Sequence, residues 1–259
     1  MLSFADADIA RWLGGFFWAF LRILALFSTA PLFGSAAIPA RAKVALAVAV
    51  AWVVGAAIPA PMTPSLSWPA LILAVQQVLV GLAIGFAMQL TLAAMGIAGD
   101  FIGVQMGFGF AGLLDVQNRF QVPVMADLFS LVGLVLFVTL NGHLLLLGIL
   151  VKSFQLVPVA PGSGISLAGW QALARSGVVL FQMGMWLALP VIAVILAGHL
   201  AVAVVSRVAP QINIMSVGFS IFMGIGLAAT IGLVPFLAPA VEHMIAAGLA
   251  LAGAALHGS

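Results

Sequence analysis

The chain has 259 residues, of which 65% are apolar and only 5% are charged, whereas about 25% of the residues of an average soluble domain carry a charge. This composition excludes an ordinary water-soluble globule and predicts a protein that lies in or against a membrane. The basic residues are scattered along the chain and give a net charge of only +2, so no nucleic-acid partner is expected, because such a footprint needs clustered basic side chains. Cysteine is absent, which excludes a disulfide framework and thiol chemistry.

Long apolar segments follow one another along the sequence. The N-terminus carries Asp6 and Asp8 where a cleavable signal peptide carries basic residues, so we expect it to be retained. About 20 apolar residues suffice for a membrane-spanning helix, and no alternation of period two competes with the helical interpretation. The sequence therefore predicts an all-α, membrane-associated fold. Helical segments are expected near residues 12–33, 44–60, 70–98, 124–151, 177–205 and 214–239, followed by a shorter apolar tail at 241–256.

Proline and glycine mark the expected loops at 31–39, 59–69, 103–124 and 158–169, with a turn at Pro210. No linker of different composition divides the chain, so we expect a single domain over residues 1–259. When six spans are alternated across a membrane, Lys and Arg are distributed almost equally between the two sides, so the positive-inside rule assigns no orientation.

Several polar side chains interrupt the apolar segments. Arg22 lies between Leu21 and Ile23, and Gln76 and Gln77 lie within the third segment. A charged side chain costs about 2 to 3 kcal/mol at the centre of a bilayer, so these groups are expected to face protein or water. The spacing of Gly81 and Gly85 permits close approach of helix backbones. Together these residues predict extensive contacts between helices.

The most informative stretch is the glycine-rich segment, residues 103–124. Its residues 107–112 match the G-x-G-x-x-G pattern, with Asp127 downstream, but a dinucleotide site needs a preceding strand and a parallel sheet, so no cofactor is predicted. Glycines permit positive φ angles and tight turns, and hydrophobic constrictions close conduits by excluding water. The segment is therefore either a hydrophobic plug or a re-entrant loop buried as core. Its glycines are Gly103, Gly107, Gly109 and Gly112, and its bulky apolar residues are Met106, Phe108, Phe110, Leu113 and Leu114.

Catalytic and metal-binding patterns are missing from the sequence. The four histidines lack the close pairing with Cys or acidic ligands that zinc sites favour, and His143 is expected at a helix end beside Asn141. Asp115 and Arg119 have the spacing of a structural pair if that part of the chain is helical. No nucleophile elbow or pair of catalytic carboxylates is present. We predict that the chain is not an enzyme and holds neither a metal nor a cofactor.

Short stretches distributed over the whole chain recur in a characteristic order and spacing. They are Ser28-Thr29-Ala30-Pro31, Pro39 with Arg41 and Lys43, Val75-Gln76-Gln77 with Gly81 and Gly85, Gly103-Val104-Gln105-Met106-Gly107 with Phe110 and Asp115, Pro123, Asn141-Gly142-His143, Arg207 with Ala209-Pro210-Gln211, Gly218-Phe219 and Glu242-His243. Together these stretches resemble the FliR/SctT family of type III secretion export-gate proteins, most closely the flagellar branch. Departures from the family pattern are Val116 and Ser220, where the family often has proline, and Leu113, where it has a second aromatic residue.

This resemblance implies a single-copy subunit that assembles with several copies of FliP and FliQ, with FlhB at the entrance, in the bacterial inner membrane at the flagellar basal body. It also implies helical hairpins related to those of FliP and FliQ, joined in one chain. The family's plug loop corresponds to about residues 106–122, where Phe110 is the best candidate to obstruct the passage of unfolded export substrates. Arg22 and Arg207 are expected to find partners inside the assembly.

Two other classes of protein compete with this interpretation. A self-contained secondary transporter would use polar residues of broken helices as a small-molecule site at mid-membrane, and an intramembrane enzyme would need a convergent nucleophile and base. Co-purification of FliP and FliQ distinguishes an export gate from both alternatives.

Overall fold

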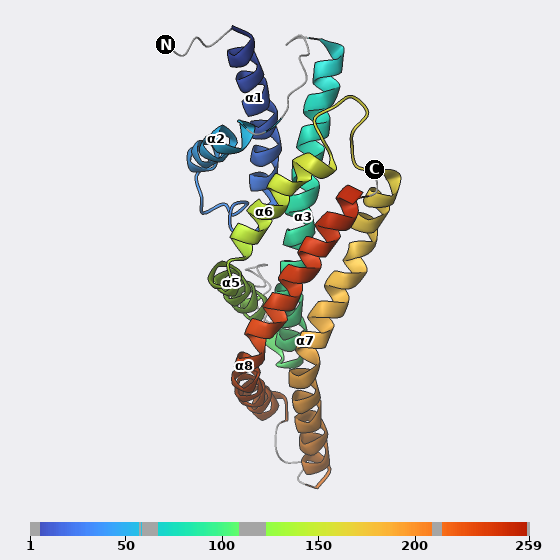
Figure 1. Cartoon of the computed structure of the whole chain (residues 1–259). Helices are drawn as coiled ribbons and strands as arrows, with labels where there is room; N and C mark the ends of the chain where they lie inside the picture. The colour runs from blue at the N-terminus through green and yellow to red at the C-terminus, as the bar shows by residue number, and fades with distance from the viewer. Residues whose placement is uncertain (1–5, 57, 59–66, 109–122, 209–213, 258–259) are drawn as a thin grey trace. The chain divides into compact units, whose positions relative to one another are not determined.

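A computed structural model describes residues 6–56, 58, 67–108, 123–208 and 214–257 of the chain. Within these residues all regular secondary structure is α-helical (Figure 1), which confirms the predicted fold class. The helices are α1 (Asp6–Thr29), α2 (Ala40–Gly55), α3 (Trp68–Gln105), α5 (Val124–Thr139), α6 (Gly142–Leu156), α7 (Leu167–Val208) and α8 (Ile214–His257).

Prolines bound the early helices as the sequence predicts. Pro31 follows the end of α1, and the extended Pro39, with φ −62° and ψ 143°, is the N-cap of α2. Pro69 lies in the first turn of α3, where a missing backbone N–H costs no intrahelical hydrogen bond. The expected loop at 31–39 is therefore confirmed.

The apolar segment expected at 124–151 is two helices rather than one. A short break separates α5 from α6, and there Asn141 adopts a left-handed conformation with φ 58° and ψ 23°. Asn tolerates this conformation better than most residues, so a polar turn interrupts the apolar run. His143 lies at the start of α6, as predicted.

The C-terminal part of the chain shows the opposite deviation. The segments expected at 214–239 and 241–256 form the single helix α8, which continues through Pro235 and Pro239. Helix α7 begins at Leu167, within the loop expected at 158–169, and contains Pro190. Prolines are tolerated inside long apolar helices where neighbouring groups compensate the lost hydrogen bond. The predicted end of the last long helix was therefore wrong.

Three helical stretches are long and apolar enough to cross a membrane, namely Trp68–Gln105, Leu167–Val208 and Gly218–Leu256, and a fourth exists if the bent pair α5 and α6 counts as one span. Fewer helices than the six apolar segments expected from hydropathy are therefore long enough to cross a membrane among the described residues. Helix α2, with 16 residues, is shorter than a span requires.

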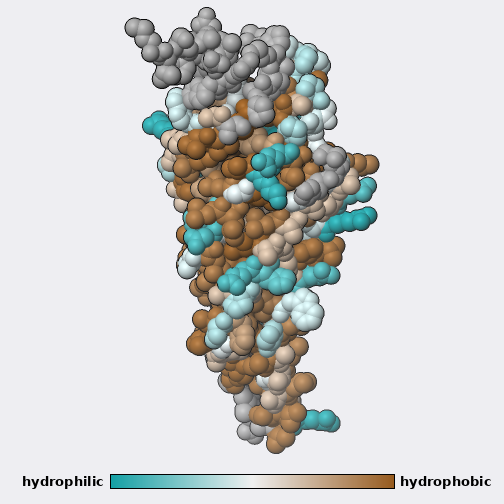
Figure 2. All heavy atoms as spheres, in the orientation of Figure 1, coloured by the Kyte–Doolittle hydropathy of each residue, from teal (hydrophilic) through white to brown (hydrophobic). Residues whose placement is uncertain are grey.

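The helices belong to two compact units. One comprises Met1–Leu90, Asn141–Gly177 and Ile245–Ser259, and the other comprises Thr91–Leu140 and Val178–Met244. Large apolar side chains are exposed in both, including Trp52 and Val53 on α2 and Leu131 and Val135 on α5. On the face drawn in Figure 2, hydrophobic side chains predominate between scattered hydrophilic ones, as expected for a protein covered by lipid or by other subunits.

Candidate functional site

The stem of the glycine-rich segment, residues 103–108, begins where α3 ends. The Met106 N–H donates to the Ile102 carbonyl at 2.9 Å, and the Gly107 N–H donates to the Val104 carbonyl at 3.1 Å. Gly107 has a φ of +90°, a conformation that glycine adopts without the steric penalty of a Cβ. Glycine at this position therefore allows the chain to leave the helix.

Met106 anchors the stem to α8. Its side chain is fully buried and lies directly against Gly226, where an added Cβ would be 2.9 Å from the Met106 sulfur and 3.0 Å from its Cε. Met is unbranched and fills irregular spaces, and the missing side chain of Gly226 provides the space. The anchor is thus a flexible side chain fitted into a gap on the facing helix.

An aromatic pair continues this contact. The rings of Phe108 and Phe219 are 6.5 Å apart between centroids and nearly perpendicular, at 89°, a favourable edge-to-face geometry. A Cβ on Gly107 would lie 3.2 Å from Cδ2 of Phe219. The start of α8 therefore packs on the stem through one ring that contacts two of its residues.

The beginning of α5 packs against the same end of α3. A Cβ on Gly99 would lie 2.6 Å from the backbone carbon of Met125 and 2.7 Å from Cα of Ala126, and one on Gly103 would lie 3.3 Å from Cβ of Met125. The two glycines are one helical turn apart and face the same neighbour. They allow α5 to approach α3 closely at the point where the glycine-rich segment departs.

The remaining predicted plug residues follow the stem in the sequence. Phe110, Leu113, Leu114, Gly109 and Gly112 lie outside the described residues, as does the expected pair of Asp115 and Arg119. Of the predicted plug and hinge residues, the stem contains Gly103, Met106, Gly107 and Phe108. All of its described contacts are apolar or involve backbone, and none is a side-chain hydrogen bond or ion pair.

A second cluster, the Arg22 cluster, lies in the other unit. The fully buried guanidinium of Arg22 donates through Nε to Oε1 of Gln77 at 2.9 Å and through Nη2 to the same oxygen. Nη1 donates to Oγ of Ser153 at 2.9 Å, and Nη2 also donates to the carbonyl of Val157 at 2.9 Å. The cluster connects α1, α3 and the end of α6 by four hydrogen bonds.

Uncharged groups compensate the buried positive charge. The guanidinium stacks 4.0 Å from the ring centroid of Phe154, a cation–π contact. Ser153 and Val157 belong to the C-terminal end of α6, where the helix dipole favours a cation. A buried charge without such compensation is strongly unfavourable, so these neighbours explain how Arg22 is tolerated within an apolar helix.

Gly81 and Gly85 of α3 face α1 next to this cluster. A Cβ on Gly81 would lie 2.9 Å from Cβ of Ala25 and 3.1 Å from the backbone carbon of Arg22, and one on Gly85 would lie 2.9 Å from the carbonyl oxygen of Leu26. The absent side chains permit close backbone approach, which brings Gln77 within reach of Arg22.

The other predicted packing residues have different surroundings. Gln76 is half-buried, and its Oε1 finds no partner among the described residues, nor does Nε2 of Gln77. Arg207 is exposed in the last turn of α7. No group of three or more His, Asp or Glu suited to a metal ion occurs in the described part of the chain.

Sequence reasoning missed several partners. Ser153, Phe154 and Val157 are more than 130 positions from Arg22, as the separations of 131 and 135 for the two hydrogen-bonded residues show, and their local sequence carries no sign of this contact. Phe219 belongs to the Gly218-Phe219 stretch of the family resemblance, but the sequence predicts no role for it. Nothing in the sequence distinguishes Gly226, the partner of Met106, from the other glycines of this apolar helix.

The comparisons with known proteins define the class. Residues 13–248 match the family of bacterial export proteins, family 1, and the chain belongs to this family. The match extends over both units and includes the stem and the Arg22 cluster.

Among its relatives are flagellar biosynthetic proteins FliR. The chain is 38% identical to that of Escherichia coli (strain K12) and 40% identical to that of Pectobacterium carotovorum subsp. carotovorum, in each case over 94% of this chain and 93% of the relative. It is 32% identical to that of Bacillus subtilis (strain 168) over 78% of this chain and 79% of the relative. The chain is thus a membrane-associated subunit of the flagellar type III export apparatus and not an enzyme, and the transporter alternative is not supported.

Proposed function

We propose that the chain is the single-copy subunit of an export gate in the bacterial inner membrane, at the base of the flagellum. In this proposal it assembles with several copies of FliP and FliQ, FlhB associates at the entrance, and the whole chain acts as one functional domain. The glycine-rich segment closes the lumen, and unfolded export substrates displace it during passage. No bond is made or broken.

The single observation that carries the gating proposal is the construction of the stem. Its anchors are Met106 against Gly226 and Phe108 against Phe219, contacts that are non-directional and exclude water. A seal of this kind can open and re-form without breaking side-chain hydrogen bonds or ion pairs. Opening requires that the two arrangements differ by no more than a few kcal/mol, which weak apolar contacts permit.

The apolar surface of the shorter helices supports assembly with other subunits. On α2, Trp52 is 57% exposed and Val53 is 73% exposed, although this helix is too short to cross a bilayer. Contiguous exposed apolar residues in such an element mark an interface. Neighbouring helices of partner subunits would cover them.

Replacing Phe110 by Ala tests the plug directly. In cells that express the complete complex, this change is expected to increase the leakage of ions or small molecules, because the largest candidate side chain of the seal is removed. Phe181→Ala, at an exposed position on α7, is the matched control. A membrane that stays tight with Phe110→Ala in an assembled complex would refute the plug role.

Co-purification tests the assembly. Isolation of the tagged chain from its native host is expected to recover FliP and FliQ at higher copy number than the chain itself. Recovery of the chain alone, or as a homo-oligomer, would contradict the proposed assembly even if the family assignment holds.

A further inference from the structure

Helix α8 carries a single acidic or basic side chain. Over Ile214–His257 its only Asp, Glu, Lys or Arg is Glu242, and the stretch Gly218–Leu256 is apolar enough to cross a membrane. The side chain of Glu242 is exposed, and it forms no ion pair with any other residue that the structure describes. A carboxylate in an apolar helix is unfavourable unless it is paired or hydrated, so Glu242 needs a partner from beyond these residues.

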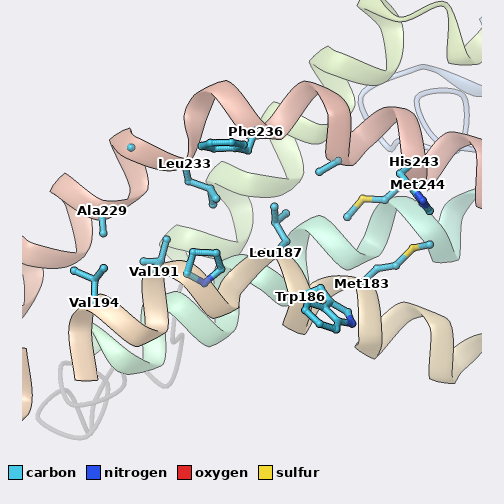
Figure 3. A pocket seen from close by; sticks show the side chains of 13 residues that line it. Met183, Trp186, Leu187, Val191, Val194, Ala229, Leu233, Phe236, His243 and Met244 are labelled. Carbon is cyan, nitrogen blue, oxygen red and sulfur yellow. The ribbon is translucent and has the colours of Figure 1, made fainter. Parts of the chain in front are cut away.

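Glu242 lies on the face of α8 that points away from α7. Figure 3 shows side chains of α8, among them Leu233 and His243, directed toward α7 across a pocket that both helices line. Ala240 belongs to this lining and Glu242 does not. Successive residues of a helix are rotated by about 100°, so Glu242 points nearly opposite to Ala240, two positions earlier. Its carboxylate therefore projects outward from the pair of helices.

Backbone oxygens on the same outward face have lost their usual donors. Pro235 and Pro239 lie inside α8, and because proline has no N–H, the carbonyls of Ile231 and Pro235 lack the hydrogen bond from the residue four positions ahead. Ile231, Pro235 and Glu242 follow one another at spacings of four and seven residues, which place them on one face of the helix. This acceptor face, defined by Ile231, Pro235 and Glu242, thus combines two freed carbonyls with one carboxylate.

The side chains around these acceptors are apolar and exposed. Ile231 is 71% exposed and Val234 is 57% exposed. Lipid tails would cover these side chains but offer no hydrogen-bond donor to the carbonyls and the carboxylate, whereas water would solvate the acceptors and leave the apolar side chains uncovered. A protein surface that places a polar anchor among apolar contacts satisfies both requirements. The acceptor face therefore has the composition of an interface with another polypeptide.

We infer that the acceptor face binds a basic side chain, arginine or lysine, that projects from an apolar helix of a neighbouring subunit. Charge and hydrogen-bonding capacity both favour this partner, because a guanidinium or ammonium group carries several donors and no acceptor. One such group can bond to the carboxylate of Glu242 and to a freed carbonyl at the same time. The inference deepens the proposed function and rests on the proposed assembly with other subunits.

The chain itself contains an arrangement of this kind. In the Arg22 cluster, one basic side chain of an apolar helix donates to the side-chain oxygen of Gln77 and to the backbone carbonyl of Val157. The acceptor face offers the corresponding half of such a contact, a side-chain oxygen together with backbone carbonyls. Because its side-chain acceptor is a carboxylate rather than an amide, the hydrogen bonds to a cation are charge-assisted on both sides and therefore stronger.

Variants of Glu242 that separate charge from size test the inference. Each is introduced into the tagged full chain, which is purified from its native host together with the other subunits. Glu242→Gln keeps the size and removes the charge, whereas Glu242→Asp, the matched control, keeps the charge and shortens the side chain. We expect the recovery of other subunits to fall about threefold with Glu242→Gln and less than about twofold with Glu242→Asp. Glu242→Lys brings two like charges together and should lower recovery at least about tenfold, equivalent to about 1.4 kcal/mol.

A photoreactive amino acid identifies the partner. Benzoylphenylalanine is introduced in place of Ala238, about one turn before Glu242, so that Glu242 itself stays unchanged. After irradiation of the purified complex, we expect crosslinks to a peptide of another subunit that contains Lys or Arg. Replacing that basic residue by Glu should restore the recovery lost with Glu242→Lys, because the pair re-forms with its charges exchanged. If Glu242→Lys does not accumulate, the crosslink in the otherwise native chain still decides.

Three results would overturn the inference and leave the proposed assembly intact. One is unchanged recovery with Glu242→Lys when the unmodified chain recovers the other subunits. Another is crosslinking from position 238 only to lipid or within the chain itself. The third is a charge exchange that does not restore recovery. If the unmodified chain recovers no other subunit, the proposed assembly fails, and this inference fails with it.

Discussion

The Arg22 cluster and the stem of the glycine-rich segment hold helices together in opposite ways. In the cluster, one guanidinium makes four hydrogen bonds that connect three helices. In the stem, a methionine fills the gap at a glycine and two phenylalanine rings meet edge to face. Directional hydrogen bonds fix one relative position of the groups they join, whereas apolar contacts tolerate rearrangement as long as water is excluded.

This difference fits two separate roles. The Arg22 cluster would be a fixed frame, and the stem of the glycine-rich segment would anchor a movable seal. A buried guanidinium cannot shift without leaving several polar groups unpaired, each at a cost of about 1 to 3 kcal/mol. Met106 can shift at much lower cost, because an unbranched side chain has several accessible conformations. Under the proposed function, the frame keeps the wall of the conduit in place while the seal yields to a substrate.

The largest effect is expected when the Arg22 cluster loses the positive charge of its guanidinium. Arg22→Met leaves the acceptors of Gln77, Ser153 and Val157 unpaired, so we expect the free energy of unfolding to fall by about 3 kcal/mol or more. Denaturation in detergent and the steady-state level of the protein measure this loss. Arg175→Met, at an exposed position, is the control, with an expected change within about 0.5 kcal/mol. Equal behaviour of both variants would contradict the role of the cluster.

Adding one methyl group to each region sharpens the comparison. Gly81→Ala places a Cβ against the backbone of Arg22, which cannot move aside, whereas Gly226→Ala meets only the side chain of Met106. We expect a loss of about 2 to 3 kcal/mol for Gly81→Ala and about 1 kcal/mol or less for Gly226→Ala. Comparing both in the same unfolding assay decides the matter, and a larger loss at Gly226 would reverse our description of the stem as the softer region.

Loosening the aromatic pair should affect the seal more than stability. Phe219→Leu removes an edge-to-face contact worth about 0.5 to 1.5 kcal/mol, and we expect increased ion leakage with little change in protein level. A double-mutant cycle with Phe108→Leu measures the coupling between the two rings. Phe86→Leu, at a partly exposed position on α3, should leave leakage unchanged, and a leak of equal size there would remove the special role of Phe219.

The smallest effect on the chain alone is expected at Arg207. Since this side chain is exposed, Arg207→Ala should change the stability of the isolated chain by less than about 0.5 kcal/mol. If a partner subunit supplies its acceptors, the same change should lower the recovery of FliP and FliQ in co-purification. Unchanged recovery would show that Arg207 has no partner in the assembly.

Composition and segment length were sufficient to predict the helical fold, because backbone polar groups in an apolar medium must be satisfied within a helix. The breaks were harder to predict. Asn141 interrupts a continuous apolar run by a single left-handed residue, whereas α8 continues through two prolines. Local signals alone do not decide these cases, since packing against neighbouring helices determines whether a turn or a proline is tolerated.

The same limit applies to the candidate site. Arg22 and Gln77 attract attention as polar residues in apolar segments, but Ser153 and the carbonyl of Val157 do not, because a backbone group is present everywhere and serine is common in helices. Gly103 and Gly107 form a plausible packing pair by spacing, yet Gly107 ends the helix and Gly99 shares the contact with Met125 instead. Spacing identifies candidates, and only tertiary contacts assign their partners.

The most direct test of the account uses the fact that the chain contains no cysteine. Phe110→Cys and, as the comparison in the frame, Ser153→Cys are introduced separately into the assembled complex, and an export substrate with one cysteine is stalled in transit. The account predicts a disulfide between the stalled substrate and the cysteine at position 110, and none at position 153. Absence of the crosslink at position 110, with the substrate stalled and the complex intact, would contradict the claim that the glycine-rich segment lines the path of export.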